Sequence, residues 1–420
     1  MQNKPYSWIP TLYFAEGLPY VLVMTLSILM FKQLGISNTD IALYTGWLYL
    51  PWVIKPIWSP FIDMFRNKRW WILLTQFVIA TGLAGIAFFI PTTDFFRWTL
   101  AIFWLLAFSS ATHDISADGF YLLALNSGDQ SLYVGIRSTF YRIAMITGEG
   151  GMLMVCGFLE KRLGTAVRAW STTFIIAAVV MLLIALYHLT ALPRCEKENT
   201  TTYTARLVWK ELAETFVSFF RKPYFLSGLL FILFYRLPEA LLAVSTRLFM
   251  IDGAEQGGLG LSTANVGLIQ GTVGVLALLA GGILGGIAIS RKGLKYWLWP
   301  MVLAISVPDA AYVFLSFHPS SSIALIGTLV GIEQFGYGFG FVAYTIFLMY
   351  FARGEHKTSH YAFCTGLMAL GMMLPRMVSG ALQEFLGYRI FFVVVLVLCG
   401  VTALVAWSIH FEPDFGKKEK

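Results

Sequence analysis

The sequence contains little charge. Only 13% of its 420 residues are Asp, Glu, Lys or Arg, whereas 57% are hydrophobic, and the mean hydropathy is +0.70. Because a soluble domain carries about 25% charged residues, this composition excludes an ordinary soluble protein. The apolar runs are continuous and do not alternate every second residue, which excludes a transmembrane β-barrel. We therefore predict an all-α integral membrane protein.

Other features are also missing. The four cysteines are far apart in the sequence, so no disulfide framework and no metal site is predicted. No Gly-x-x-x-x-Gly-Lys-Ser/Thr loop is present, which argues against a protein powered by nucleotide hydrolysis. The first residues, MQNKPYSWIP, lack the pattern of a cleaved signal peptide. We expect neither a cofactor nor a metal.

Long apolar segments recur along the whole chain. The longest polar segment, 193–223, separates six apolar segments from six more, so we predict 12 transmembrane helices in two six-helix halves, 1–192 and 224–420. Within the linker, Val208, Leu212, Phe216 and Phe219 recur at helical spacing and predict an amphipathic helix on the membrane surface. The predicted spans are 8–31, 39–59, 70–90, 97–124, 135–159, 168–190, 223–249, 263–288, 296–316, 322–352, 359–385 and 388–411.

The distribution of Lys and Arg predicts the orientation. If both termini are cytoplasmic, the inside segments hold 18 of these residues and the outside loops hold 6. Positive charge accumulates on the cytoplasmic side of membrane proteins. We therefore expect the N-terminus and the C-terminus to be cytoplasmic.

Several charged or strongly polar residues fall inside the predicted spans. An ionised side chain at the bilayer centre costs roughly 2.5–3.5 kcal/mol on insertion scales, so such residues face a cavity or a partner. Their distribution over several helices predicts one shared, water-accessible cavity with a substrate and proton pathway. The candidate residues are Glu16, Asp114, Asp118, Arg142, Glu149, Arg236, Glu239, Glu333, Gln334 and Arg376.

Sequence spacing indicates which of these residues can act together. Asp114 and Asp118 are four residues apart and share one face of a helix, with Arg142 predicted at a comparable depth. Arg142 and Glu149 are seven apart and would also share a face in a regular helix. We expect His113 to be a polar residue whose hydrogen bonds are satisfied within the helix packing, in preference to a residue that relays protons.

Two loops at equivalent places in the halves resemble each other. SPFIDMFRNKRW (59–70) and GGIAISRKGLKYW (285–297) each have a small residue, a short apolar step and a basic cluster. Both are similar to the Gly-x-x-x-Asp-Arg-x-Gly-Arg-Arg loop of the major facilitator superfamily, although Ser59 and Met64 depart from it. The resemblance implies two halves related by an axis along the membrane normal. It also implies a cytoplasmic gate that would include Asp63, Arg66, Arg69 and Arg291.

Longer matches resemble the AmpG family of muropeptide permeases within that superfamily. They are ATHDISADGF (111–120), FYRIAM (140–145), FYRLPEA (234–240) and IEQFGYGFGFVAYTIFLM (332–349). The resemblance implies that Asp114, Asp118, Arg142, Arg236 and Glu239 occupy functional positions. The sequence departs from the family pattern in having Glu16 in place of a small polar residue, His113 in place of Gln, and Glu239 in place of Asp.

This resemblance implies proton-driven import of peptidoglycan fragments across the inner membrane by a monomer. The substrate class would be N-acetylglucosaminyl-anhydromuramic acid with or without peptide, and no nucleic acid partner is expected. The main alternative is a transporter of another anionic solute, such as acetyl-CoA or an organic acid. A membrane-embedded enzyme acting on lipid-linked sugars is disfavoured because the outside loops are short and poor in acids. A sensor without transport is a further alternative.

Overall fold

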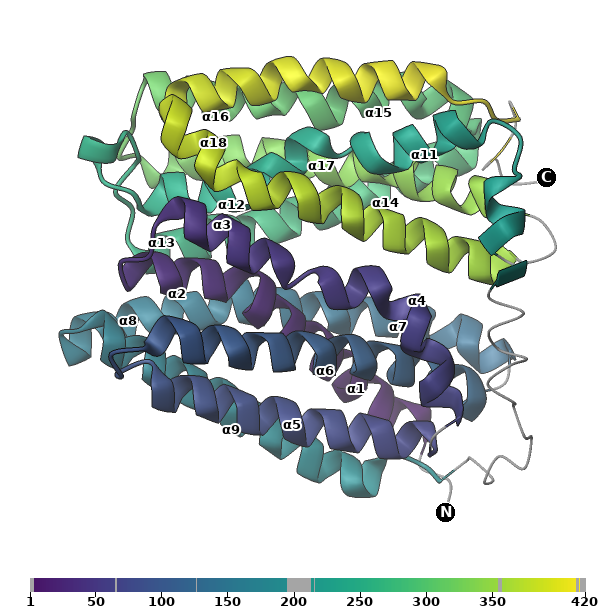
Figure 1. Cartoon of the computed structure of the whole chain (residues 1–420), viewed down its shortest axis with the longest axis horizontal. Helices are drawn as coiled ribbons and strands as arrows, with labels where there is room; N and C mark the ends of the chain where they lie inside the picture. The colour runs from purple at the N-terminus through teal and green to yellow at the C-terminus, as the bar shows by residue number, and fades with distance from the viewer. Residues whose placement is uncertain are drawn as a thin grey trace. The chain divides into compact units, whose positions relative to one another are not determined.

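The computed structural model describes residues 4–64, 66–125, 127–194, 213–214, 216–353, 357–412 and 415. Every regular element in this part of the chain is a helix, as predicted (Figure 1). The chain divides into two compact units. The first comprises Met1–Ile36 and Ile54–Thr204, and the second comprises Ser37–Val53 and Ala205–Lys420.

The first unit is organised around its first span. One continuous helix is formed by α1 (Pro5–Val21), a π-helical turn (Leu22–Leu26) and α2 (Ser27–Gln33). In the apolar stretch of this helix, 89% of the residues are buried inside the protein. α5 packs between α6 and α9, and α7 packs on α1. The other helices are α4 (Leu50–Met64, in this unit from residue 54), α5 (Lys68–Phe89), α6 (Phe95–Ala124), α7 (Ser127–Met145), a π-helical turn (Ile146–Met152), α8 (Leu153–Leu163) and α9 (Ala166–Ala191).

The second unit has a core rich in aromatic residues. Tyr235 and Tyr344 stack at 5.5 Å between ring centroids, and their hydroxyl groups donate to the backbone carbonyls of Gly340 and Ile232. Its helices are α3 (Asn38–Trp47), α11 (Phe225–Phe234), α12 (Leu237–Ile251), α13 (Thr263–Val266), a π-helical segment (Gly267–Gly274), α14 (Val275–Lys292), α15 (Leu294–Ser306), a 3₁₀ turn (Val307–Asp309), α16 (Ala310–Phe317), α17 (Ile323–Phe351) and α18 (Lys357–Ser408). A short 3₁₀ turn, Ala254–Gln256, lies between α12 and α13.

The described residues contain ten helical segments that are long and apolar enough to cross a membrane. One of them, within α18, runs for 49 residues and is divided by Gly387, whose φ of 70° and ψ of 160° are not helical. α3 and α4 together occupy the predicted second span and are separated by a break at residues 48–49. If the two parts of α18 are counted separately, and α3 with α4 is counted as one further span, the structure agrees with the prediction of twelve membrane-spanning helices.

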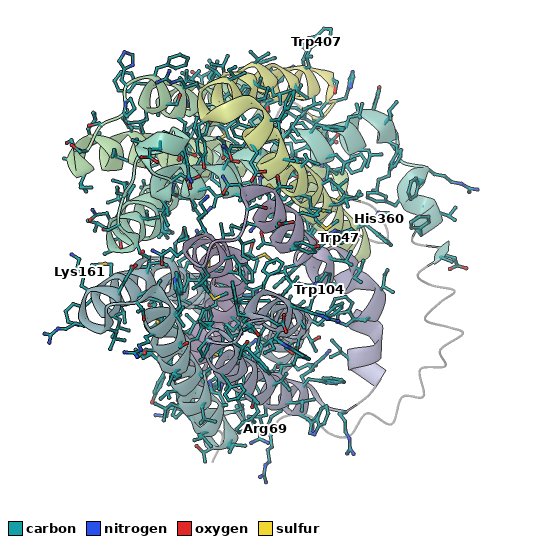
Figure 2. All side chains as sticks on the ribbon, turned by 60° about the vertical axis from the view of Figure 1, so that its left-hand side comes forward. Trp47, Arg69, Trp104, Lys161, His360 and Trp407 are labelled. Atoms are coloured by element: carbon teal, nitrogen blue, oxygen red, sulfur yellow. The ribbon has the colours of Figure 1, made fainter. Side chains whose placement is uncertain are left out.

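Large apolar side chains remain exposed on the outer faces of the helices. Trp407 is 76% exposed and projects from the surface of the second unit in Figure 2, and Phe385 is 86% exposed. In water such exposure would be unfavourable, but these faces suit contact with lipid.

The predicted linker helix is only partly described. Val208 and Leu212 lie outside the described residues, whereas Phe216 and Phe219 lie in a short helical stretch. Phe219 is buried in the core of the second unit, where its ring packs against Phe225 and Phe351. The boundaries 1–192, 193–223 and 224–420 stay a prediction.

Two helices of the second unit, α14 and α17, approach closely at glycines. A Cβ atom at Gly281 would collide with the backbone oxygen of Phe335, and one at Gly338 would collide with that of Leu278. Gly286, on the same helix as Gly281, has nothing within 4 Å of the position of a Cβ. Small residues allow this kind of approach between membrane helices.

We expect Gly281→Ala to destabilise the protein and Gly286→Ala to stabilise it. Overpacking costs about 1–3 kcal/mol, whereas replacing an open helical glycine with alanine contributes up to about 1 kcal/mol. Thermal unfolding of the purified variants in detergent measures both effects. A Gly281→Ala variant that unfolds at or above the temperature of the parent would contradict the packing described.

Candidate functional site

The first unit brings three of the predicted acids together. Glu16 lies on α1, and Asp114 and Asp118 lie one turn apart on α6. One carboxylate oxygen of each residue lies within 4.8 Å of one oxygen of each of the other two, and Glu16 is 7% exposed. The four-residue spacing of the aspartates places both on the face of α6 that meets α1. We call these three residues the first acid cluster.

Two cations neutralise part of this cluster. Lys55, on α4, forms an ion pair with Asp114, and Arg137, on α7, forms one with Asp118 at 2.6 Å. Arg137 also lies over the ring of Tyr13, 4.5 Å from its centroid, which is a cation–π geometry. Lys55 and Arg137 were not among the predicted site residues. The sequence feature that could have identified them is a basic residue inside or beside an apolar span.

Arg142 and Glu149 do not join the first acid cluster. Arg142 lies on α7 beyond Arg137, half-buried, and the ion pair with Asp118 is made by Arg137. Glu149 is buried within the π-helical turn Ile146–Met152. The predicted shared face of Arg142 and Glu149 assumed a regular α-helix. One extra residue in a π turn rotates the remainder of the helix by about 100°.

His113 takes part in a chain of buried hydrogen bonds. The Gln76 amide donates to His113 Nε2 (2.9 Å), and the Gln76 carbonyl accepts from His188 Nδ1 (3.0 Å). The Thr11 hydroxyl donates to His188 Nε2 at 2.8 Å. This chain joins α1, α5, α6 and α9, and the packing role of His113 stays a prediction.

The second unit contains a second acid cluster, formed by Glu239, Asp309 and Glu333. These residues lie on α12, in the 3₁₀ turn Val307–Asp309 and on α17, and one carboxylate oxygen of each lies within 4.8 Å of one oxygen of each of the other two. Glu333 accepts hydrogen bonds from Tyr312 (3.0 Å) and from its neighbour Gln334. Asp309 was absent from the predicted site, although it is an acid within a predicted apolar span.

Two arginines of the second unit lie against aromatic rings. Arg236 donates to the Tyr337 hydroxyl and lies over the ring of Phe341, 4.6 Å from its centroid. Arg376 is buried on α18 and lies 5.1 Å from the centroid of the Tyr49 ring. Both arginines were predicted as pathway residues. An aromatic face holds a guanidinium in place through a cation–π interaction.

Polar contacts attach residues 37–53 to the second unit. Asn38, at the start of α3, donates to Gln383 on α18 at 2.7 Å and to Asp252 at 3.2 Å. Tyr388 donates to the same carboxylate oxygen of Asp252 at 2.6 Å. The segment was predicted to belong to the N-terminal bundle, and these contacts explain why it groups with the second unit.

The predicted gate residues have different surroundings. Asp63 lies on α4, and its side chain is outside what the structure describes. Arg66 is exposed and has a φ of 67° between α4 and α5, and Arg291 is exposed near the end of α14. Arg69 donates to the backbone carbonyls of Leu189 (2.6 Å) and Leu192 (3.2 Å), so it caps the end of α9. The gate itself stays a prediction.

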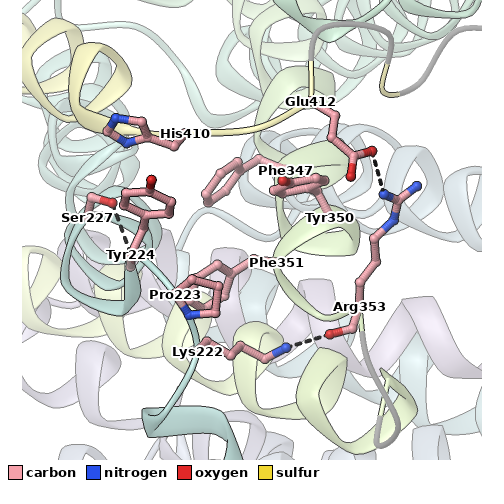
Figure 3. Close-up of a pocket in the computed structure, with 10 residues that line it drawn as sticks. All are labelled: Lys222, Pro223, Tyr224, Ser227, Phe347, Tyr350, Phe351, Arg353, His410 and Glu412. Carbon is pink, nitrogen blue, oxygen red and sulfur yellow. Dashed lines mark hydrogen bonds and ion pairs between the residues drawn. The ribbon is translucent and has the colours of Figure 1, made fainter.

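A cavity of about 270 Å³ opens at one end of the second unit, and Figure 3 draws the ten residues that line it. Lys222 donates to the Arg353 carbonyl (2.6 Å), and Arg353 forms an ion pair with Glu412 (3.0 Å). Partial burial lowers the pKa of Lys222. Tyr224 stacks on His410 with 4.4 Å between centroids. The predicted pathway residues do not line this cavity.

Comparison with known proteins finds relatives along most of the chain. The chain is 26% identical over 392 residues to the anhydromuropeptide permease of Escherichia coli K12. This alignment covers 90% of this chain and 74% of the relative. It is 26% identical over 400 residues to the protein named AmpG 4 of Rickettsia conorii, covering 91% of both. The predicted resemblance to AmpG-like permeases is therefore confirmed.

Solved structures show the same fold. A D-xylose-proton symporter aligns over 99% of both chains with a TM-score of 0.72 and 12% identity. A bacterial homologue of the human lysosomal transporter Spinster aligns over 98% of this chain and 99% of that chain, with a TM-score of 0.70 and 15% identity. The sequence model of the Major Facilitator Superfamily matches residues 11–363. The chain thus belongs to the major facilitator superfamily and is a multi-pass membrane transporter.

Proposed function

We propose that the protein imports peptidoglycan-derived muropeptides together with protons. The substrate class is N-acetylglucosaminyl-anhydromuramic acid with or without peptide. The observation that carries the proposal is the similarity to an anhydromuropeptide permease over nine tenths of the chain. The buried acids and arginines within the membrane helices supply the chemistry for an anionic substrate and a proton.

The first acid cluster is the proposed proton site. Glu16, Asp114 and Asp118 carry three negative charges when ionised, and Lys55 and Arg137 supply two positive charges. One excess negative charge in a partly buried place is unfavourable, and a bound proton removes it. The cluster would accept a proton on the outside and release it on the cytoplasmic side.

Arginines are the proposed groups for substrate carboxylates. A guanidinium binds a carboxylate through two parallel hydrogen bonds, and Arg142, Arg236 and Arg376 are candidates for this role. Glu149 and Gln334 would supply polar groups along the same path. In this proposal the pathway residues of both halves line one chamber.

The proposed mechanism is alternating access by a monomer in the inner membrane, with both termini cytoplasmic. Residues 1–192 would rock against 224–420 while the linker connects them. Asp63, Arg66, Arg69 and Arg291 would lie at the cytoplasmic ends, where the chamber opens and closes.

Uptake into proteoliposomes tests the proposal. We expect labelled N-acetylglucosaminyl-anhydromuramic acid to accumulate when the lumen is alkaline relative to the medium, and accumulation to stop when a protonophore collapses the gradient. Labelled acetyl-CoA and a small organic acid serve as competing substrates in the same vesicles. Undiminished uptake without a gradient would exclude proton coupling, and uptake of only a competing substrate would exclude the muropeptide.

A further inference from the structure

The second acid cluster is enclosed more completely than the first. Glu239 is 7% exposed, and Asp309 and Glu333 are each 2% exposed. They come from three separate elements of one unit, and the packing of these elements brings one carboxylate oxygen of each residue within 4.8 Å of the others. Three ionised carboxylates cannot remain so close in a buried place without a compensating positive charge.

The hydrogen-bond partners of the cluster do not satisfy all of its oxygens. Tyr312 donates to Glu333, and the Cys399 thiol donates to Asp309 Oδ2 at 3.4 Å. Among the described residues, Glu239 Oε1 and Asp309 Oδ1 are fully buried and have no hydrogen-bond partner. A proton on one of these carboxyls would supply the missing donor, because a carboxylic acid donates to a neighbouring carboxylate.

The nearby cations leave one negative charge uncompensated. Arg236 acts electrostatically on Glu239, and Arg247 acts on Glu333. Within the described part of the chain, three acids against two arginines give an excess charge of minus one. The other titratable groups that interact with the cluster are neutral when protonated: Tyr235, Tyr312, Tyr337 and Cys399.

The same balance is found in the first unit. There, too, three acids meet two cations, Lys55 and Arg137. In each half, one acid belongs to the first span, with Glu16 in one case and Glu239 in the other. The fourth span of each half carries the next acids: Asp114 and Asp118 in the first half, and Glu333 in the second. Each unit therefore carries one excess negative charge, although the residues that make it up differ between the units.

We propose that Glu239, Asp309 and Glu333 form a second proton-binding site, so that two protons enter with each substrate molecule, one through each unit. The site is loaded when a proton from the outside converts one carboxylate to a carboxylic acid, and it is emptied when that proton leaves to the cytoplasm. This inference rests on the proposed proton-coupled import.

The proton-to-substrate ratio measures the proposal directly. Proteoliposomes are loaded with labelled N-acetylglucosaminyl-anhydromuramic acid at known internal and external concentrations, the membrane potential is clamped at zero, and the pH difference across the membrane is varied until net flux is zero. For the parent protein, we expect the pH difference at zero flux to correspond to a ratio of two. A ratio of one or zero would overturn the second site, whether or not any variant folds. A ratio of zero would also overturn proton-coupled import, whereas a ratio of one would leave it intact.

Isosteric variants locate the second proton. We expect Glu239→Gln and Asp309→Asn each to lower the ratio from two to one, and Glu16→Gln to do the same through the first cluster. The matched control is Glu255→Gln, an exposed acid of the same unit, which should keep a ratio of two. Fluorescence-detected size exclusion verifies that each variant is folded.

Two outcomes would overturn the assignment of the site. If Glu239→Gln and Asp309→Asn fold and transport with a ratio of two, the second proton does not bind at this cluster. If a sodium or calcium gradient drives uptake in the parent and this dependence is lost in both variants, the cluster holds a metal cation in place of a proton.

Discussion

Lys55→Met is expected to reduce both the stability of the protein and its uptake of substrate. The substitution keeps most of the side-chain length but removes the ammonium group that pairs with Asp114. Side-chain exposures of 33% for Lys55 and 18% for Asp114 mean that water screens the pair only partly. Leaving one partner alone costs about 1–3 kcal/mol. The first acid cluster then carries two uncompensated negative charges and would retain protons, which would slow their release.

Two further variants separate stability from transport. Lys55→Met/Asp114→Asn removes both charges, so we expect its thermal unfolding temperature to return toward that of the parent while uptake stays low. Lys161→Met is the control, because Lys161 is an exposed lysine at the end of α8, labelled in Figure 2. If Lys55→Met unfolds and transports like the parent, the ion pair with Asp114 contributes nothing to either property.

Arg236→Ala is expected to raise the KM for an anionic substrate by about 10- to 150-fold. Hydrogen bonds to charged groups contribute about 1.5–3 kcal/mol, and each 1.36 kcal/mol corresponds to a factor of about ten. Arg236 is held by the Tyr337 hydroxyl and by the face of Phe341. Arg236→Lys retains the charge but loses the planar fork and the stacking, so we expect an intermediate KM.

An analogue in which the muramic carboxyl is an amide tests whether Arg236 binds that group. The parent and Arg236→Ala should take up the amide with similar KM values, because the carboxylate that the arginine binds is absent. Arg168→Ala, an exposed arginine of α9, is the control and should match the parent on both substrates. Equal KM values of the parent and Arg236→Ala for the acid would remove Arg236 from the substrate site.

The acids of the first cluster were predictable, but their cations were not. Asp114 and Asp118 share a face because an α-helix repeats every 3.6 residues, so their cooperation follows from spacing alone. Lys55 and Arg137 approach them from α4 and α7, and no periodicity relates residues on different helices. Arg142 was the predicted partner by depth, whereas the observed partner lies five residues earlier on the same helix.

Breaks within helices explain other differences. The π-helical turn Ile146–Met152 changes the face on which Glu149 lies, and the spacing of residues in the sequence did not indicate it. Asp309 joins the second cluster because the 3₁₀ turn Val307–Asp309 interrupts the span between α15 and α16. Local helical geometry of this kind depends on packing against neighbouring helices and therefore appears only in three dimensions.

By itself, the sequence determined that the chain crosses a membrane many times and that its buried charges must serve a pathway or one another. The reason is that hydrocarbon excludes ionised groups, a constraint that every residue of a span obeys independently of its neighbours. Only the tertiary structure decided which acid meets which cation, and that residues 37–53 attach to the second unit. Those outcomes depend on how each helix is rotated, tilted and broken against the others.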